Sequence, residues 1–192
     1  MDIDAKFQDD LKLLDMNYDQ AVQYLLKKYG PAEHNYFTEQ SYDKFLAGIN
    51  KTLTKGKVSR TKEGLYCHHI DEIHALNLSN PRFIKYYRYP YAYQKKERLV
   101  YCNLIEHLIL HALITYETKR QFGYPGFQIL AVNVFDWYVK GEVPRKNTWK
   151  FNTYTAAYLP KDLVIKLNPK LNNLVNLGAT TTEELQQKLQ AN

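Results

Sequence analysis

The stretch Leu99-Val100-Tyr101-Cys102-Asn103-Leu104-Ile105-Glu106-His107-Leu108-Ile109-Leu110-His111 decides the fold of the middle of this chain. Its first four residues are apolar or aromatic and predict a short strand. Asn103 is a good helix N-cap, and Glu106 three residues later completes a capping box. The helix that follows, predicted to end near Thr118, is apolar nearly all round and is therefore expected to be buried.

Histidines gather in and just before this stretch. Five of the six in the chain fall between residues 68 and 111. His107 and His111 are four residues apart, so they share one face of the predicted helix and can chelate a metal. His68 and His69 end a second predicted strand, Leu65 to Ile70. Neighbouring side chains of a strand point to opposite faces, so we expect one of this pair to face a metal and the other a water.

Helices are predicted on both sides of this segment. Apolar spacing places them at about residues 19–29, from Thr38 or Ser41 to Leu53 (with Phe45, Leu46 and Ile49 inward), 127–140 and 182–190. Residues 71–96 are expected to be mostly loop with one helical turn, and residues 142–180 show no assignable pattern. The sequence thus predicts one compact α+β domain. Its strand-and-helix core, residues 57–125, is flanked by an N-terminal helical segment, residues 1–56, and a helical or irregular extension, residues 126–192.

Composition narrows the class of protein. The 192 residues carry a formal net charge of +6, include 17 tyrosines and contain only two cysteines. The charge permits a polyanionic partner, and the cysteine count is typical of a reducing compartment. No apolar run is long enough for a membrane span, and the N-terminus lacks the regions of a signal peptide. We therefore expect a soluble cytoplasmic protein, and the charge leaves room for a nucleic acid, DNA or RNA, as its partner.

The histidine pattern suits phosphodiester hydrolysis. That reaction needs a water activated in line with the leaving oxygen and a cation that neutralises charge on the phosphate. A neutral histidine can accept the proton of the water near pH 7. The other imidazoles can hold the cation.

Residues 64–111 resemble the HNH, or ββα-metal, endonucleases, in particular small HNH-type proteins of bacterial and phage genomes. The resemblance rests on Cys67-His68-His69-Ile70 and on Leu99 to Cys102 followed by His107 and His111. It implies a ββα-metal core that hydrolyses DNA. It also implies that His69 is the general base and that the metal ligands are His68, His107 and His111.

One position departs from the family pattern. The family usually carries an Asn nine residues before the first helix histidine, where it orients the base, and this chain has Arg98. Arg98 can bind phosphate while another group holds His69; Gln94, Glu97 and Asn103 are the nearby polar candidates, although Asn103 is better explained as the helix cap. Alternatively, the site binds without cleaving.

The identity of the metal is less constrained. An all-imidazole site suits Zn, Ni, Co or Mn better than Mg, which prefers oxygen ligands. Asp71 or Glu72 could add a carboxylate, although both are also typical loop acids. Cys67 and Cys102 are interpreted as small core residues, because the paired Cys-x-x-Cys motifs of a structural zinc site are absent from the sequence.

A basic, tyrosine-rich segment separates the two halves of the site. Basic side chains bind phosphates irrespective of sequence, and aromatic rings can stack on unpaired bases. The alternative is a solvated loop whose tyrosines enter the core. The predicted phosphate-binding residues are Arg82, Lys85, Arg88, Lys95 and Lys96, with residues 55–62 as a second, weaker candidate patch.

Three functions therefore follow from the sequence. The first is a metal-dependent HNH endonuclease. The second is a nucleic-acid-binding protein that keeps the metal for structure and does not cleave, which Arg98 would explain. The third is a regulatory or toxin-like protein that uses the same scaffold for protein contacts.

Overall fold

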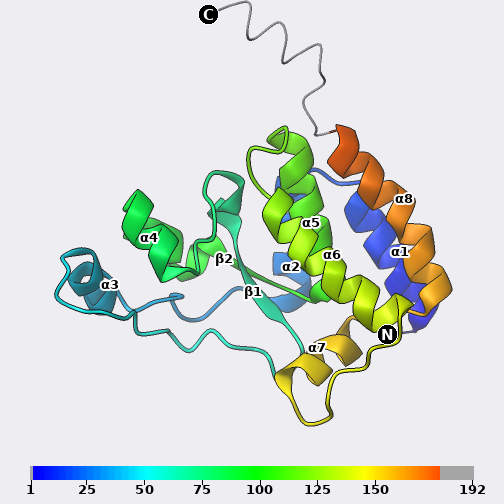
Figure 1. Cartoon of the computed structure of the whole chain (residues 1–192), viewed down its shortest axis with the longest axis horizontal. Helices are drawn as coiled ribbons and strands as arrows, with labels where there is room; N and C mark the ends of the chain where they lie inside the picture. The colour runs from blue at the N-terminus through cyan, green and yellow to red at the C-terminus, as the bar shows by residue number, and fades with distance from the viewer. Residues whose placement is uncertain (1, 178–192) are drawn as a thin grey trace, which may run out of the picture.

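A computed structural model describes residues 2–177, which form eight α-helices and one two-stranded sheet (Figure 1). The mixture of helix and strand confirms the α+β expectation. In chain order the elements are α1 (Ile3–Leu14), α2 (Tyr18–Tyr29), α3 (Glu39–Leu46), β1 (Tyr66–His69), α4 (Pro81–Tyr87), β2 (Leu99–Cys102), α5 (Leu104–Glu117), α6 (Tyr124–Val134), α7 (Trp149–Ala156) and α8 (Lys161–Leu177). Short 3-10 turns span Ile70–Ile73, Tyr91–Gln94 and Lys96–Arg98, and a π turn, Phe135–Val139, extends α6.

Strands β1 and β2 pair antiparallel, with His68 opposite Val100 and His69 opposite Leu99. The pleat therefore sends Tyr66, His68, Val100 and Cys102 to one face and Cys67, His69, Leu99 and Tyr101 to the other. Two hydrophobic clusters occupy these faces. The α5 cluster is built on the first face from α1, α2, α5, α6 and α8. The α3 cluster lies on the second face and comprises Ala32, Tyr36, Phe37, Tyr42, Phe45, Val58, Leu65, Ile84, Leu99 and Tyr101.

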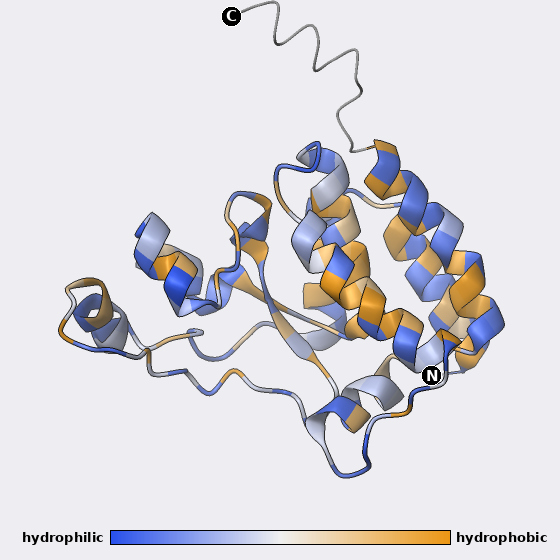
Figure 2. Ribbon diagram, viewed as in Figure 1, coloured by the Kyte–Doolittle hydropathy of each residue, from blue (hydrophilic) through white to orange (hydrophobic). Residues whose placement is uncertain are grey.

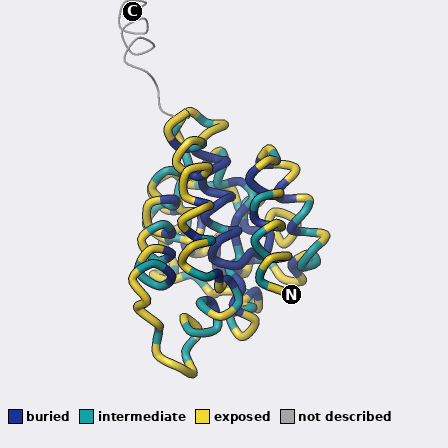
Figure 3. Tube along the Cα trace, turned by 90° about the vertical axis from the view of Figure 1, so that its right-hand side faces the viewer, coloured by how far each residue is buried: buried dark blue, intermediate teal, exposed yellow. Residues whose placement is uncertain are grey.

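Helix α5 is the centre of the larger cluster. Every residue from Leu104 to Thr115 except His107 is buried, as its nearly continuous apolar sequence predicted. Helices α1, α2, α6 and α8 pack against it (Figure 1), and the burial runs through the interior of this helical layer (Figure 3). Both ends of the described chain thus cover the helix that carries His107 and His111.

The start of α5 is set by the predicted capping box. The Asn103 side chain accepts hydrogen bonds from the amides of Ile105 and Glu106, and Glu106 Oε2 accepts one from the Asn103 amide at 2.7 Å. The other Glu106 oxygen accepts from Lys28 Nζ at 2.7 Å and from the Tyr29 hydroxyl at 3.0 Å. The cap therefore also ties α5 to α2.

Several predicted boundaries are wrong. Helix α3 ends at Leu46 rather than Leu53, and Ile49, predicted to face inward, is 72% exposed. Residues 71–96 contain the two-turn helix α4 as well as 3-10 turns. Residues 142–177, which showed no pattern, form α7 and the long α8, with Pro169 inside α8. The helix predicted at 182–190 lies outside the described residues.

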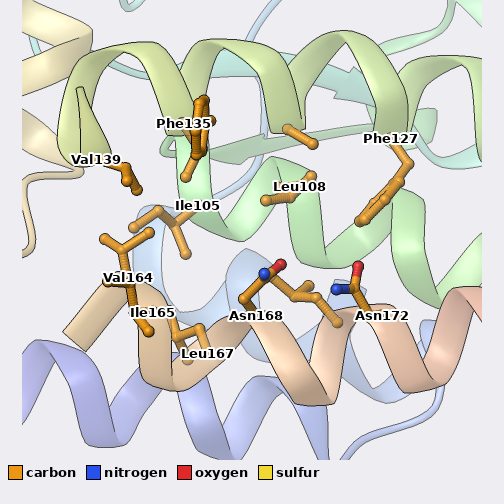
Figure 4. A pocket seen from close by; sticks show the side chains of 13 residues that line it. Ile105, Leu108, Phe127, Phe135, Val139, Val164, Ile165, Leu167, Asn168 and Asn172 are labelled. Carbon is orange, nitrogen blue, oxygen red and sulfur yellow. The ribbon is translucent and has the colours of Figure 1, made fainter. Parts of the chain in front are cut away.

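An apolar pocket lies between α5, α6 and α8 (Figure 4), where Figure 2 shows mainly hydrophobic segments of α5 and α6. Ile105 and Leu108 reach it from α5, and Asn168 and Asn172 stand on its α8 side. None of its lining residues is titratable, so we place no chemistry there. Within residues 2–177, no helix has both the length and the hydropathy needed to cross a membrane.

One buried carboxyl group works against the stability of this packing. Asp10 of α1 is buried and its Oδ2 lacks a hydrogen-bond partner within the described chain. Burial, reinforced by the nearby Glu106 carboxylate, raises the pKa of Asp10 well above its usual value. A raised acid pKa means that this group favours folding below its unfolded pKa and opposes folding as the pH rises above it.

We therefore predict that Asp10→Asn raises the free energy of unfolding at pH 7 by about 1 kcal/mol or more. The gain should shrink as the pH falls toward 4, because the unfolded Asp10 then also carries its proton. Urea denaturation at several pH values measures this, with the exposed Asp4→Asn as control. A destabilised Asp10→Asn protein at pH 7 would contradict the prediction.

Candidate metal centre

Three imidazoles converge where β1 faces α5. His68 comes from β1, and His107 and His111 come from successive turns of α5. Their ring centres lie 4.9 to 5.2 Å apart, and His68 Nδ1 is 3.2 Å from His107 Nε2. One nitrogen of each ring lies within 4.8 Å of the other two. The three predicted metal ligands are therefore close enough to hold a metal ion.

Burial keeps these imidazoles neutral. His68 is only 2% exposed, His111 is buried and His107 is partly exposed. Burial, followed by the neighbouring imidazoles, lowers the pKa of His68 and of His107 well below its usual value. Burial also lowers the pKa of His111 to about 4, and the Gly123 backbone opposes this shift. Neutral imidazole is the form that binds a metal.

The Tyr18 hydroxyl sets the tautomer of His68. It donates to the carbonyl of Ile70 at 2.9 Å and lies 2.9 Å from His68 Nε2. With its single proton given to Ile70, this hydroxyl accepts from His68 Nε2–H. The His68 proton is thus on Nε2, and the Nδ1 lone pair faces His107. A hydrogen bond of this kind, to the distant nitrogen, commonly orients metal-binding histidines.

Gly126 of α6 makes room for His111. A Cβ added at Gly126 would lie 2.5 Å from His111 Nδ1, closer than any real Cβ contact. A side chain at residue 126 would therefore displace the imidazole. The sequence signal, a lone glycine directly after Pro125, was too weak to reveal this role.

The donor set fits a divalent cation. The Nδ1 atoms of His107 and His111 are buried without a partner in hydrogen-bonding geometry among residues 2–177. Burial of three neutral imidazoles is costly, and an ion bound by the nitrogens that face one another, His68 Nδ1 and His107 Nε2 among them, would offset that cost. Imidazole suits Zn, Cu, Fe and Ni in particular.

Asp71 and Glu72, the two acids that follow β1, have different partners in the structure. Glu72 turns toward the imidazoles, and its Oε2 lies 3.5 Å from His111 Nε2 and 3.7 Å from His68 Nδ1. Burial raises the pKa of Glu72 to about 7, although the Leu78 backbone opposes the shift. Asp71 instead accepts hydrogen bonds from Nε and Nη2 of Arg98, the former at 2.8 Å. The sequence pointed to both acids but could not tell which one reaches the cluster.

His69 faces away from the three imidazoles, as the strand alternation predicted. It is 2% exposed and packs against Tyr36, with ring centres 4.4 Å apart. Its Nε2 lies 3.1 Å from Gln94 Oε1, and the Gln94 amide in turn donates to the Leu78 carbonyl at 3.0 Å. Burial lowers the pKa of His69 to about 4. Gln94 thus contacts the predicted base, whereas the Arg98 guanidinium is paired with Asp71.

The predicted phosphate-binding residues are all exposed: Arg82, Lys85, Arg88, Lys95 and Lys96. The tyrosines among them divide into two groups. Tyr86 is 81% exposed and Tyr87 is also exposed, so both can reach a ligand. The hydroxyls of Tyr89 and Tyr91 instead bond the Leu76 amide and the Phe37 carbonyl, which makes these two rings part of the fold.

The remaining candidates lie away from the cluster. Cys67 and Cys102 lie on opposite faces of the sheet, so they cannot form half of a metal site together. Both are free thiols, and Cys102 is buried in the α5 cluster. His74 and His34 are exposed.

Comparison with models of known protein families, with curated proteins and with solved structures finds no match to this chain.

We predict that Tyr18→Phe weakens divalent metal binding by about tenfold, because the His68 tautomer is no longer held. Competition with a chromophoric chelator measures the affinity. Tyr116→Phe, an exposed change on α5, should bind as the wild type does. Equal affinity in wild type and Tyr18→Phe would show that the hydroxyl serves packing alone.

A second prediction concerns Gly126. Gly126→Ala should cost about 1–3 kcal/mol of stability through overpacking and should weaken metal binding at least about tenfold, since His111 must move. Thermal unfolding with and without metal measures both effects, with Gln128→Ala on the exposed face of α6 as control. A Gly126→Ala variant that gains as much thermal stability from metal as the wild type would refute the proposed packing.

Proposed function

We propose that this protein is a metal-dependent endonuclease of the HNH type that hydrolyses phosphodiester bonds in DNA. One observation carries the proposal: an antiparallel strand pair and the helix that follows it bring His68, His107 and His111 together. Strand, strand and helix in that order, with the three histidines at those places, support the ββα-metal arrangement that the resemblance implies.

Each side chain has a defined task in this proposal. A bound divalent ion would neutralise charge on the scissile phosphate and on the leaving oxygen. The imidazoles of His68, His107 and His111 hold that ion. Gln94 Oε1 accepts the Nε2–H of His69, so the Nδ1 lone pair of His69 remains to take a proton from water. Gln94 thereby does the orienting work that the family assigns to an Asn.

Cations stand near the proposed base. Lys95 and Lys96 directly follow Gln94, and both are exposed. Lys55 Nζ lies 4.7 Å from the centre of the Tyr36 ring, which packs on His69. These charges, together with Arg82, Lys85 and Arg88, offer contacts to a phosphate backbone that are independent of base sequence.

A second candidate function is a nucleic-acid-binding or regulatory protein in which the ion serves the fold. The burial of His69 favours it, because a side chain with 2% exposure gives water little access and its pKa is lowered to about 4. In that case the same ion would bind and stabilise the protein, and no phosphodiester bond would be cut.

Cleavage assays separate the two. Plasmid DNA is incubated with wild type, His69→Ala or His34→Ala in the presence of Mn²⁺, Mg²⁺, Co²⁺, Ni²⁺ or Zn²⁺, with a single-stranded RNA in parallel. The nuclease proposal predicts cleavage of DNA that falls at least about 100-fold in His69→Ala and is unchanged in His34→Ala. Cleavage that survives His69→Ala, or metal binding without cleavage under any ion, would refute it, and RNA cleavage alone would refute the choice of DNA.

A further inference from the structure

We infer that Glu72 is a fourth protein ligand, so that the ion is held by three histidines and one carboxylate. The inference rests on the metal site of the proposed function and deepens it. It goes beyond the three imidazoles because it assigns the coordination number supplied by the protein, and that number decides which ions leave room for a substrate.

The spacing of the donor atoms carries the assignment. Ligand atoms about 2.1 Å from a tetrahedral ion lie about 3.4 Å from one another. The His68 Nδ1 to His107 Nε2 distance is 3.2 Å, and Glu72 Oε2 lies 3.5 Å from His111 Nε2 and 3.7 Å from His68 Nδ1. The carboxylate oxygen therefore stands close to the required separation from the nitrogens of His68 and His111. Among the residues that the structure describes, only the three histidines have donor atoms that all lie within 4.8 Å of one another, so Glu72 must shift toward His107 when the ion binds.

Direct hydrogen bonds to His68 and His111 do not account for this placement. An N–H···O bond normally measures about 2.7–3.2 Å, and both Glu72 distances are longer. His68 has its proton on Nε2, where Tyr18 accepts it, so His68 Nδ1 offers Glu72 only a lone pair. A cation shared by the two atoms would account for their approach.

Glu72 also differs from the neighbouring acid in its partners. Asp71 forms an ion pair with the Arg98 guanidinium. Among the ion pairs of residues 2–177, Glu72 contacts only His68 and His111. Its side chain is 15% exposed, and the Leu78 backbone bonds to it. A largely buried carboxylate without a lysine or arginine is the group that a metal ion compensates.

The fourth ligand has a consequence for the choice of metal. Zinc sites with four protein ligands are structural, and catalytic zinc sites keep one position for water. Ions that take six ligands, such as Mn²⁺, would retain open positions beside three histidines and one glutamate. We therefore expect Zn²⁺ to bind tightly without supporting cleavage, and Mn²⁺ to support it.

The test uses Co²⁺ alone, because its visible absorption reports ligand number. Metal-free wild type, Glu72→Gln and Glu72→Ala are titrated with Co²⁺, and affinities are measured against a competing chelator. Glu97→Gln, an exposed acid in a nearby turn, is the matched control. Loss of the Glu72 carboxylate should weaken binding at least about tenfold and change the absorption bands, while the control matches wild type.

The outcomes separate the role of Glu72 from the existence of the metal site. Variants that bind Co²⁺ as tightly as wild type and with the same spectrum would overturn the role of Glu72 and leave the three-histidine site intact. A wild type that binds no Co²⁺ would overturn the metal site itself. Circular dichroism verifies folding of each metal-free variant. Should Glu72 variants not fold, a crystal structure of Zn²⁺-loaded wild type decides, since three imidazoles plus a Glu72 carboxylate oxygen are expected around the ion and three imidazoles plus water would refute the inference.

Discussion

The antiparallel register of β1 against β2 is the constraint on which the rest of the site depends. It pairs His68 with Val100 and so directs the imidazole of His68 toward α5. A slip by one residue would exchange the faces, sending His69 to α5 and His68 into the α3 cluster. Buried apolar residues on both faces of the two strands make such a slip costly. The same capping box that ends β2 also begins α5, so strand, cap and helix are set as one unit.

The cluster that results is costly for a protein without metal. Three neutral imidazoles and one carboxyl group occupy a largely buried region, and two ring nitrogens remain without hydrogen-bond partners among the described residues. Each buried, unsatisfied polar group costs about 1–3 kcal/mol. A divalent ion would bind the nitrogens that face one another, His68 Nδ1 and His107 Nε2 among them, and its binding energy would offset this cost. The Tyr18 hydroxyl contacts His68 and Gly126 leaves room for His111, so both residues hold these rings in place.

Local sequence signals predicted the centre of the fold well. The limits of β2, the start of α5, its capping box and its burial all depend on neighbouring residues, and the structure confirms them. Strand alternation also predicted that His68 and His69 face opposite ways. Helix α8 was missed because Pro169 and the asparagines around it are poor helix signals, although Pro169 stands on the exposed side. Ile49 was misplaced because α3 stops before that turn.

The parts of the site that escaped prediction depend on contacts between distant segments. Tyr18 meets His68 across 50 residues, and Gln94 meets His69 across 25. Nothing in the local sequence separates the role of Asp71 from that of Glu72, because the choice is made by where Arg98 and the imidazoles lie. The position of Arg98 was expected to decide whether the site is active. In the structure Gln94, not Arg98, contacts the predicted base. Whether the site is active therefore depends on how Gln94 orients His69 and on whether water reaches His69.

The central claim is that three histidines of β1 and α5 bind one divalent ion, and anomalous diffraction from crystals of the metal-loaded protein tests it most directly. We predict a single strong peak at the metal absorption edge, about 2.1 Å from one nitrogen each of His68, His107 and His111. A peak elsewhere on the molecule, or no peak at a metal concentration well above that of the protein, would contradict the claim.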